Sequence, residues 1–77
     1  MKTYYIRKSA ATYGCALIIA NTFEEAKHIA RNVDINDMME ETECYSIDHL
    51  VEISSEEAKD YDIPTLQQTQ EGYKVKA

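Results

Sequence analysis

One apolar run, Cys15-Ala16-Leu17-Ile18-Ile19-Ala20, constrains the fold of this 77-residue chain more than any other feature. Six residues are far fewer than the roughly 20 that a membrane-spanning helix needs. They are also fewer than an ordinary helix of a globular protein contains, and a short continuous run rich in Leu and Ile is typical of a fully buried strand. The run therefore predicts a central strand that is buried on both faces, and no membrane segment.

The residues before this run predict a second strand beside it. From Thr3 to Lys8, Tyr4 and Ile6 fall on one face of an extended chain, and the more polar residues alternate onto the other. The intervening stretch 9–14 is small or polar and ends in Gly14, which suits a hairpin loop. Strands over residues 3–8 and 15–20 should thus pair as an antiparallel hairpin.

A helix should follow the apolar run. Thr22 and Glu25 have the spacing of a capping box, in which each side chain satisfies a backbone N–H of the first turn. Apolar residues then recur at helical spacing as Phe23, Ala26, Ile29 or Ala30, and Val33. This spacing predicts an amphipathic helix that covers one face of the sheet.

The second half of the chain carries weaker signals. Residues 34–43 have no clear period and are interpreted as a loop or a short helix. Alternation between 44 and 53 favours a third strand with a bulge near His49. Ser54 to Glu57 form a second capping box, which opens a short helix that must end at Ile63-Pro64. Residues 65–71 are polar, and 72–76 alternate, so that 64–77 is either a flexible tail or includes an edge strand.

Together these elements predict one small α+β domain over residues 1–77. Its sheet has three or four mostly antiparallel strands in the sequence order β-β-α-β, followed by the short second helix. The main helix packs on one face of that sheet.

The charge of the chain is unevenly distributed. Fourteen acidic against eight basic side chains give a formal net charge of −6. Residues 1–33, with five basic and two acidic side chains, carry +3, whereas residues 34–62, with eleven acids and only Lys59, carry −10. Nucleic-acid binders gain affinity from Lys and Arg that neutralise phosphates. The overall sign therefore disfavours direct nucleic-acid binding and favours a basic protein as the partner.

Composition and motifs argue against an enzyme. A chain of 8.8 kDa supports a modest core but not a core together with a roomy catalytic cleft. The sequence contains no glycine-rich phosphate loop, no nucleophile elbow and no zinc-protease motif. Two cysteines are too few for the disulfide framework of small secreted domains, which favours the cytoplasm. We therefore expect no catalytic activity and no cofactor.

Metal binding is also not expected. The four soft ligands Cys15, His28, Cys44 and His49 do not form the close local pairs of a structural zinc site. A calcium loop starting at Asp34 would need Gly at its sixth position and Glu at its twelfth, where Met39 and Tyr45 stand.

The acidic segment has two interpretations. It is either a solvated surface that keeps the domain in solution, or a set of carboxylates that imitates the phosphates of a nucleic acid and so occupies a basic surface of a partner. Carboxylates at helical spacing lie about 5–6 Å apart, and duplex DNA carries about one charge per 1.7 Å of axis. The candidate partner-binding residues are Glu40, Glu43, Glu52, Glu56, Glu57 and Asp60.

Residues 3–31 resemble the small DpnD/PcfM-like proteins of bacterial mobile elements. The resemblance rests on Thr3-Tyr4-Tyr5-Ile6, on the run 15–20 and on Thr22-Phe23-Glu24-Glu25-Ala26. It implies a phage or conjugative-element context, in which small acidic proteins commonly bind host proteins, and it carries over no site residues. The predicted function is accordingly a non-catalytic inhibitor that binds a basic partner surface. The alternative is a structural domain that self-associates through a sheet edge or its tyrosines.

Overall fold

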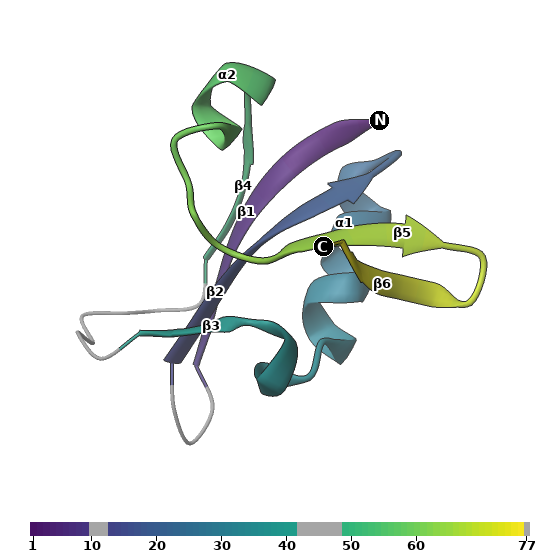
Figure 1. The fold of residues 1–77 in the computed structure, drawn as a ribbon. Coiled ribbons are helices and arrows are strands. Elements are labelled where there is room, and N and C mark those ends of the chain that lie inside the picture. Colours follow the sequence, from purple (N-terminus) through teal and green to yellow (C-terminus); the bar gives the residue numbers. More distant parts are fainter. Residues whose placement is uncertain (10–12, 42–48, 77) are drawn as a thin grey trace.

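The computed structural model describes residues 1–9, 13–41 and 49–76. These residues form six strands, two α-helices and one 3-10 turn (Figure 1). In chain order they are β1 (Lys2–Ser9), β2 (Tyr13–Ala20), α1 (Phe23–Asn32), η1 (Ile35–Asp37), β3 (Met39–Glu41), β4 (His49–Ile53), α2 (Ser55–Ala58), β5 (Thr65–Thr69) and β6 (Gly72–Lys76).

The strands form one mixed sheet in the order β4-β1-β2-β5-β6. β1 pairs with β2 as the predicted antiparallel hairpin, and β4 pairs antiparallel with the other edge of β1. The second edge of β2 is shared. Residues Tyr13 to Cys15 pair antiparallel with β3, and Leu17 to Ile19 pair parallel with β5. β2 is thus bonded along both edges, which makes it the central strand that its apolar run predicted.

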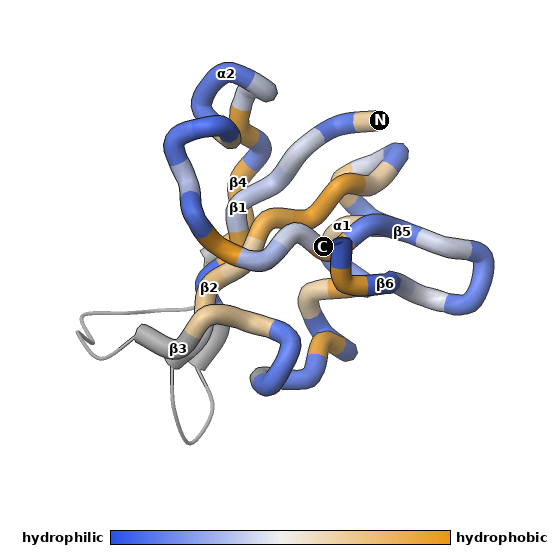
Figure 2. The backbone as a smooth tube through the Cα atoms, viewed as in Figure 1, coloured by the Kyte–Doolittle hydropathy of each residue, from blue (hydrophilic) through white to orange (hydrophobic). Residues whose placement is uncertain are grey.

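Both faces of β2 are covered, as predicted, except at Ile19, which is partly buried. Ala16, Ile18 and Ala20 point to one face and are fully buried, while Cys15 and Leu17 point to the other and are also buried. Figure 2 shows this hydrophobic run passing through the middle of the molecule, whereas α2 and the β5–β6 turn are hydrophilic. The sheet therefore has a first face, formed by the even-numbered residues of β1 and β2, and a second face, formed by the odd-numbered ones.

The helix α1 covers the first face. Thr22 is its N-cap, and the Thr22 hydroxyl accepts a hydrogen bond from the backbone N–H of Glu25 at 3.2 Å. Ala26 and Ile29 are buried against Tyr4, Ile18 and the other apolar residues of this face. The predicted helix, its start and its packing on one face are confirmed. Of the predicted capping box, the Thr22 half is present, whereas the Glu25 carboxylate accepts from the Thr22 hydroxyl at 3.4 Å rather than from a backbone N–H.

The connection from β4 to β5 crosses the second face. β4 and β5 both run parallel to β2, yet β1 and β2 lie between them, so residues 54–64 must pass over these two strands. On the way, the Tyr61 ring stacks on Tyr5 with ring centroids 5.1 Å apart, and the Leu17 N–H donates to the Pro64 carbonyl at 2.8 Å. Figure 1 shows α1 and this connection on opposite sides of the sheet.

The sheet is mostly antiparallel, as expected, but the prediction of three or four strands was wrong. The α+β class is correct, but the described residues form six strands, and β5 joins β2 in parallel. The polar stretch 65–71 contains β5, and the acidic stretch 34–43 contains η1 and β3. Residues 72–76 form the edge strand β6, as one of the two predictions for this segment proposed.

Two boundaries also differ. β4 pairs with β1 without a bulge from His49 to Ile53, and residues 44–48 of the predicted strand lie outside the described residues. The second helix ends at Ala58 rather than near Pro64. Helices gain most of their stability from packing an apolar face, and α2 has no buried residue to hold further turns.

Two tyrosines of the first face differ in how their hydroxyls are satisfied. The Tyr73 hydroxyl of β6 donates to the Asp37 carboxylate at 2.5 Å and accepts from the Asp34 N–H at 3.2 Å, which ties the C-terminal hairpin to η1. The Tyr4 hydroxyl is buried and has no hydrogen-bond partner among the described residues. Its ring contacts Phe23 edge-on, with centroids 5.9 Å apart.

We expect Tyr73→Phe and Tyr4→Phe to change stability in opposite directions. Tyr73→Phe leaves the half-buried Asp37 carboxylate without its donor and should lower the free energy of unfolding by about 1–2 kcal/mol. Tyr4→Phe removes a buried hydroxyl that has no hydrogen-bond partner among the described residues, and should raise the free energy of unfolding by about 1 kcal/mol. Urea unfolding of both variants measures this, and equal losses would contradict the assignment.

The same bond predicts a loss of stability in alkali. Burial, followed by the hydrogen bond to Asp37, raises the pKa of Tyr73 above its usual value, although the Asp34 N–H opposes this. The folded protein thus holds the phenol proton more tightly than the unfolded chain. The contribution of this bound proton to the stability of the fold is complete below about pH 10, and it disappears as the pH rises through the raised pKa of Tyr73. Unfolding curves between pH 8 and 11 should show a smaller alkaline loss in Tyr73→Phe than in the wild type.

Candidate functional site

The carboxyl ends of three strands lie at one end of the sheet. Ile19 of β2 pairs with Gln67 of β5. On its other edge Ile19 pairs with Thr3 of β1, and Thr3 in turn pairs with Ile53 of β4, so all of these residues lie at the same height in the sheet. α1 begins just after β2 ends, α2 begins just after β4 ends, and the β5–β6 turn follows β5. Segments far apart in the sequence therefore lie along the same end of the sheet, with α2 beside β4 and the β5–β6 turn on the far side of β2.

Acidic residues from all of these segments are placed there. We call this region the acidic end, and its members are Glu24, Glu25, Glu52, Glu56, Glu57 and Glu71. Glu25 is partly buried and the other five are exposed. The nearby ammonium groups of Lys2 and Lys59 pair with two of these carboxylates, Glu52 at 4.0 Å and Glu56 at 3.3 Å. The acidic end therefore presents a net negative surface.

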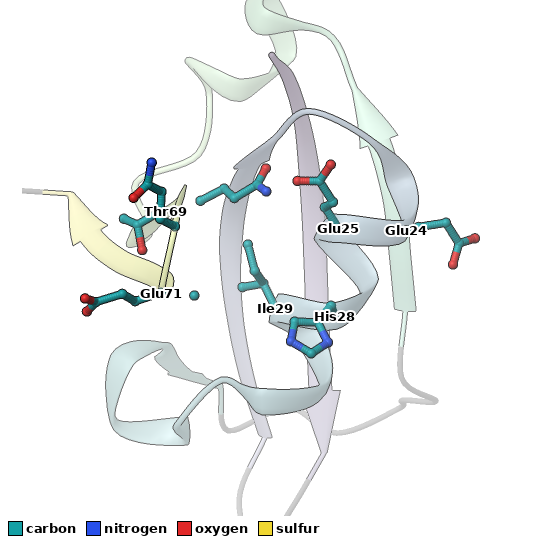
Figure 3. A pocket seen from close by; sticks show the side chains of 9 residues that line it. Glu24, Glu25, His28, Ile29, Thr69 and Glu71 are labelled. Carbon is teal, nitrogen blue, oxygen red and sulfur yellow. The ribbon is translucent and has the colours of Figure 1, made fainter.

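A groove separates α1 from the β5–β6 hairpin at the acidic end (Figure 3). It has a volume of about 330 Å³, and Glu25, His28 and Ile29 line it from the helix, with Glu71 and Gly72 opposite. Gln68 closes one side, where its side-chain oxygen accepts a hydrogen bond from the Asn21 N–H at 3.0 Å. The acids that line the groove are Glu24, Glu25 and Glu71, and in Figure 3 the Glu24 side chain extends away from the hairpin.

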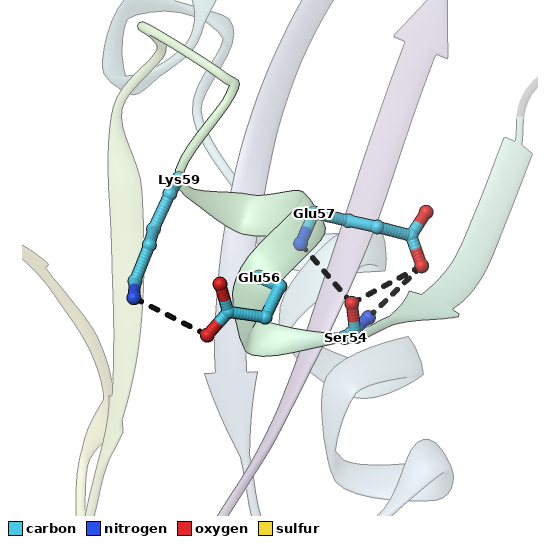
Figure 4. Close-up of polar contacts among 4 residues, drawn as sticks. All are labelled: Ser54, Glu56, Glu57 and Lys59. Carbon is cyan, nitrogen blue, oxygen red and sulfur yellow. Dashed lines mark hydrogen bonds and ion pairs between the residues drawn. The ribbon is translucent and has the colours of Figure 1, made fainter.

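The α2 turn carries two acids in different roles (Figure 4). The Ser54 hydroxyl accepts from the Glu57 N–H at 3.0 Å, and the Glu57 carboxylate accepts in return from the Ser54 N–H at 3.4 Å. This reciprocal pair confirms the predicted capping box. Glu56 faces solvent, and its carboxylate accepts from the Lys59 ammonium at 3.3 Å.

The structure brings only part of the predicted site together. Glu52, Glu56, Glu57 and Asp60 are all exposed and lie on β4, on α2 or directly after α2. Glu40 lies on β3 opposite Gly14, whereas Glu52 lies opposite Tyr4. Glu40 and Glu52 are separated by three strand spacings across the sheet and by four residues along the strand direction. Their backbones are therefore about 20 Å apart. Glu43 lies outside the described residues.

The sequence analysis missed three residues of this site: Glu24, Glu25 and Glu71. The two helix residues were correctly assigned to the first turn of a helix, but they belong to the segment with a positive net charge. Only the positions of β2 and β5 in the sheet show that these acids share an end with α2. The polar composition around Glu71 could have indicated a turn, but not its location.

The described residues contain little that suggests metal chemistry or a membrane segment. They include no group of three or more His, Cys, Asp or Glu side chains arranged to hold a metal ion. Cys15, the cysteine among them, is buried. Within the same residues, no helix has the length and apolar character needed to cross a bilayer.

No family model, curated protein or solved structure matches this chain. The resemblance to DpnD/PcfM-like proteins therefore stays a prediction.

We expect the α2 turn to depend on its cap. Ser54→Ala removes the hydroxyl that accepts from the Glu57 N–H and should cost about 1 kcal/mol in the local stability of this turn. Hydrogen exchange at the Glu57 amide should then become about fivefold faster. Ser55→Ala, one residue further along, is the matched control because Ser55 is not the cap. Equal acceleration in both variants would contradict the role of Ser54.

Proposed function

We propose that this chain is a non-catalytic binding protein whose acidic end occupies a basic surface of a partner protein. The observation that carries the proposal is that carboxylates from α1, β4, α2 and the β5–β6 turn all lie along one end of the sheet. Like charges brought together by folding repel one another and disfavour the compact state. A basic partner would relieve that repulsion.

The lysines of the acidic end do not remove its attraction for a partner. Both ion pairs join exposed side chains, with more than half of each side chain accessible to solvent. Exposed pairs of this kind contribute about 0–1 kcal/mol. Glu52 and Glu56 can therefore exchange these lysines for basic groups of a partner at small cost.

Some of these acids have a sufficient explanation in folding alone. Glu24, Glu25, Glu56 and Glu57 lie in the first turns of helices, where the helix dipole favours negative charge. Glu52 lies on a strand and Glu71 in a turn, so neither is explained by a helix. These two residues are the most informative about a partner.

The kind of partner follows from charge. A basic surface that accepts several separated carboxylates is typical of proteins that bind nucleic acids, since such surfaces are built to contact phosphates. The proposal therefore extends to an inhibitor that occupies a nucleic-acid site, in keeping with the mobile-element context implied by the resemblance. The separation of Glu40 from α2 argues against a continuous row of carboxylates along residues 40–60.

The double variant Glu52→Gln, Glu71→Gln tests the proposal. It removes two charges from the acidic end without touching a helix cap, and should weaken salt-sensitive capture of basic proteins from a host lysate about fivefold or more. Capture should also fall steeply between 50 and 300 mM salt, because exposed charges are screened over about 10 Å at 0.1 M. Addition of duplex DNA should release the captured partner if the basic surface is a nucleic-acid site.

The matched control is Glu40→Gln, Glu41→Gln. It makes the same change in charge on β3, at the opposite end of β2. If this control weakens capture as much as the first variant does, overall charge rather than the acidic end controls binding, and the proposed site is wrong.

The alternative, self-association through a sheet edge, receives less support. In the described sheet β4, β6 and the short strand β3 are edge strands. On β6, Lys74 and Lys76 are exposed, and lysines on an edge strand are a common device against edge-to-edge pairing. Light scattering decides this point, since a stable homo-oligomer would favour the structural role.

A further inference from the structure

A second groove lies on the second face of the sheet, away from α1, and has a character opposite to that of the acidic end. Its floor is apolar and consists of Leu17 and Ile19 from β2, with Ala58 and Ile63 from the connection that crosses this face. Lys59 and Lys76 stand at its rim, and its volume is about 400 Å³. We call it the second-face groove.

The register of the sheet explains why these residues meet. Leu17 pairs with Thr65 on β5, and Thr65 pairs with Lys76 on β6, so the three side chains share one face. The neighbouring pair of Thr3 and Ile19 lies on the same face. The groove is therefore part of the ordered sheet rather than a gap in a loop.

The floor is incompletely covered. Leu17 is buried, whereas Ile19 and Ile63 are each only partly buried. The connection 54–64 covers the Tyr5 side of this face through Tyr61, and the groove lies between that connection and β6. Its volume is within the range of about 300–1,000 Å³ that small-molecule sites occupy.

The rim determines the charge of a suitable ligand. In a chain of net charge −6, two of the eight basic side chains border this one groove. Lys59 pairs with Glu56, but both side chains are highly exposed and the pair is weak, so the ammonium can turn to a bound anion. Hydroxyl groups of Thr3, Ser55 and Thr65 also line the groove and can donate to an anion.

We propose that the second-face groove binds a small amphiphilic carboxylate, an unbranched aliphatic chain of medium length with one carboxylate. The chain would lie on Leu17, Ile19 and Ile63, and the carboxylate would lie between Lys59 and Lys76. This site adjoins the acidic end at α2, but the proposal does not depend on the function proposed for that end.

A hydrocarbon fits this groove better than a peptide does. The strand residues that line it already use their backbone N–H and C=O groups in the ladders of β1, β2, β5 and β6. A peptide lying across the face of the sheet would bury amide groups without backbone partners, and such burial is costly. An aliphatic chain has no such groups, and each buried CH₂ contributes about 0.8 kcal/mol.

The test is a titration of the full chain at pH 7 with octanoate and, separately, with octylammonium, followed by amide chemical shifts. Both probes have the same aliphatic chain and opposite charges, and both are kept below micelle-forming concentrations. Octanoate should shift the amides of Leu17, Ile19 and Ile63 and should bind about fivefold or more tightly than octylammonium. Failure of octanoate to bind at millimolar concentration, or equal binding of the two probes, would overturn the proposal.

Matched lysine variants locate the carboxylate. Lys76→Met keeps an aliphatic side chain but removes the charge and should weaken octanoate binding about two- to fivefold, as expected for an exposed charge pair. Lys74→Met, on the same strand but outside the groove, should leave it unchanged. Equal weakening of octanoate binding in both variants would exclude this site for an aliphatic carboxylate. The same conclusion would follow if an apolar peptide displaced octanoate at a concentration below that of octanoate itself.

Discussion

The hydrogen-bond ladders of β2 are the interaction on which the rest of the structure depends. One edge of β2 is paired with β1 along its whole length, and the other edge is divided between β3 and β5. Because backbone groups buried on this strand must be satisfied, the chain has to return to β2 twice after leaving it at Ala20. It first returns antiparallel as β3 and then parallel as β5. The positions of α1, α2 and the C-terminal hairpin follow from these two returns.

The parallel return has the larger consequences. Parallel strands cannot be joined by a tight turn, and here β4 and β5 are separated by β1 and β2, so residues 54–64 must cross a face of the sheet. α1 already occupies the first face, which leaves the second face for the crossing. The same pairing aligns the carboxyl ends of β2, β4 and β5. The acidic end and the second-face groove are thus two results of one topological feature.

The sequence was sufficient to identify the strands and helices whose signal lies within a few neighbouring residues. The apolar run, the alternation of Tyr4 and Ile6, and the two capping boxes identified β1, β2, α1 and the start of α2. It was insufficient for β3 and β5, because neither has an alternating pattern. In β5 only Leu66 is buried, and the strand is otherwise Thr and Gln, which carry little hydrophobic signal. What holds β5 in place is pairing with a strand almost fifty residues earlier, and no local pattern encodes such a contact.

The candidate site shows the same limit for charge. Residues 34–62 carry most of the negative charge in the sequence, yet the fold sends Glu40 to one end of the sheet and Glu52 to the other. The segment with positive net charge supplies Glu24 and Glu25 to the acidic end. Charge counted along the chain therefore predicted the sign of the surface and three of its six members, Glu52, Glu56 and Glu57. It could not predict where the surface ends, because that depends on which strands are parallel.

The two surfaces meet at α2, and this has a physical consequence. A four-residue helix without a buried residue cannot hold its position by itself. Its place is fixed by the β4 ladder before it and, after it, by the Tyr61 ring on Tyr5 and the hydrogen bond from Leu17 to Pro64. Ala58 and Lys59, which line the second-face groove, follow directly after Glu56 and Glu57 of the acidic end. Contacts made in the groove therefore act on the same turn that presents these carboxylates, so the two surfaces share one structural support.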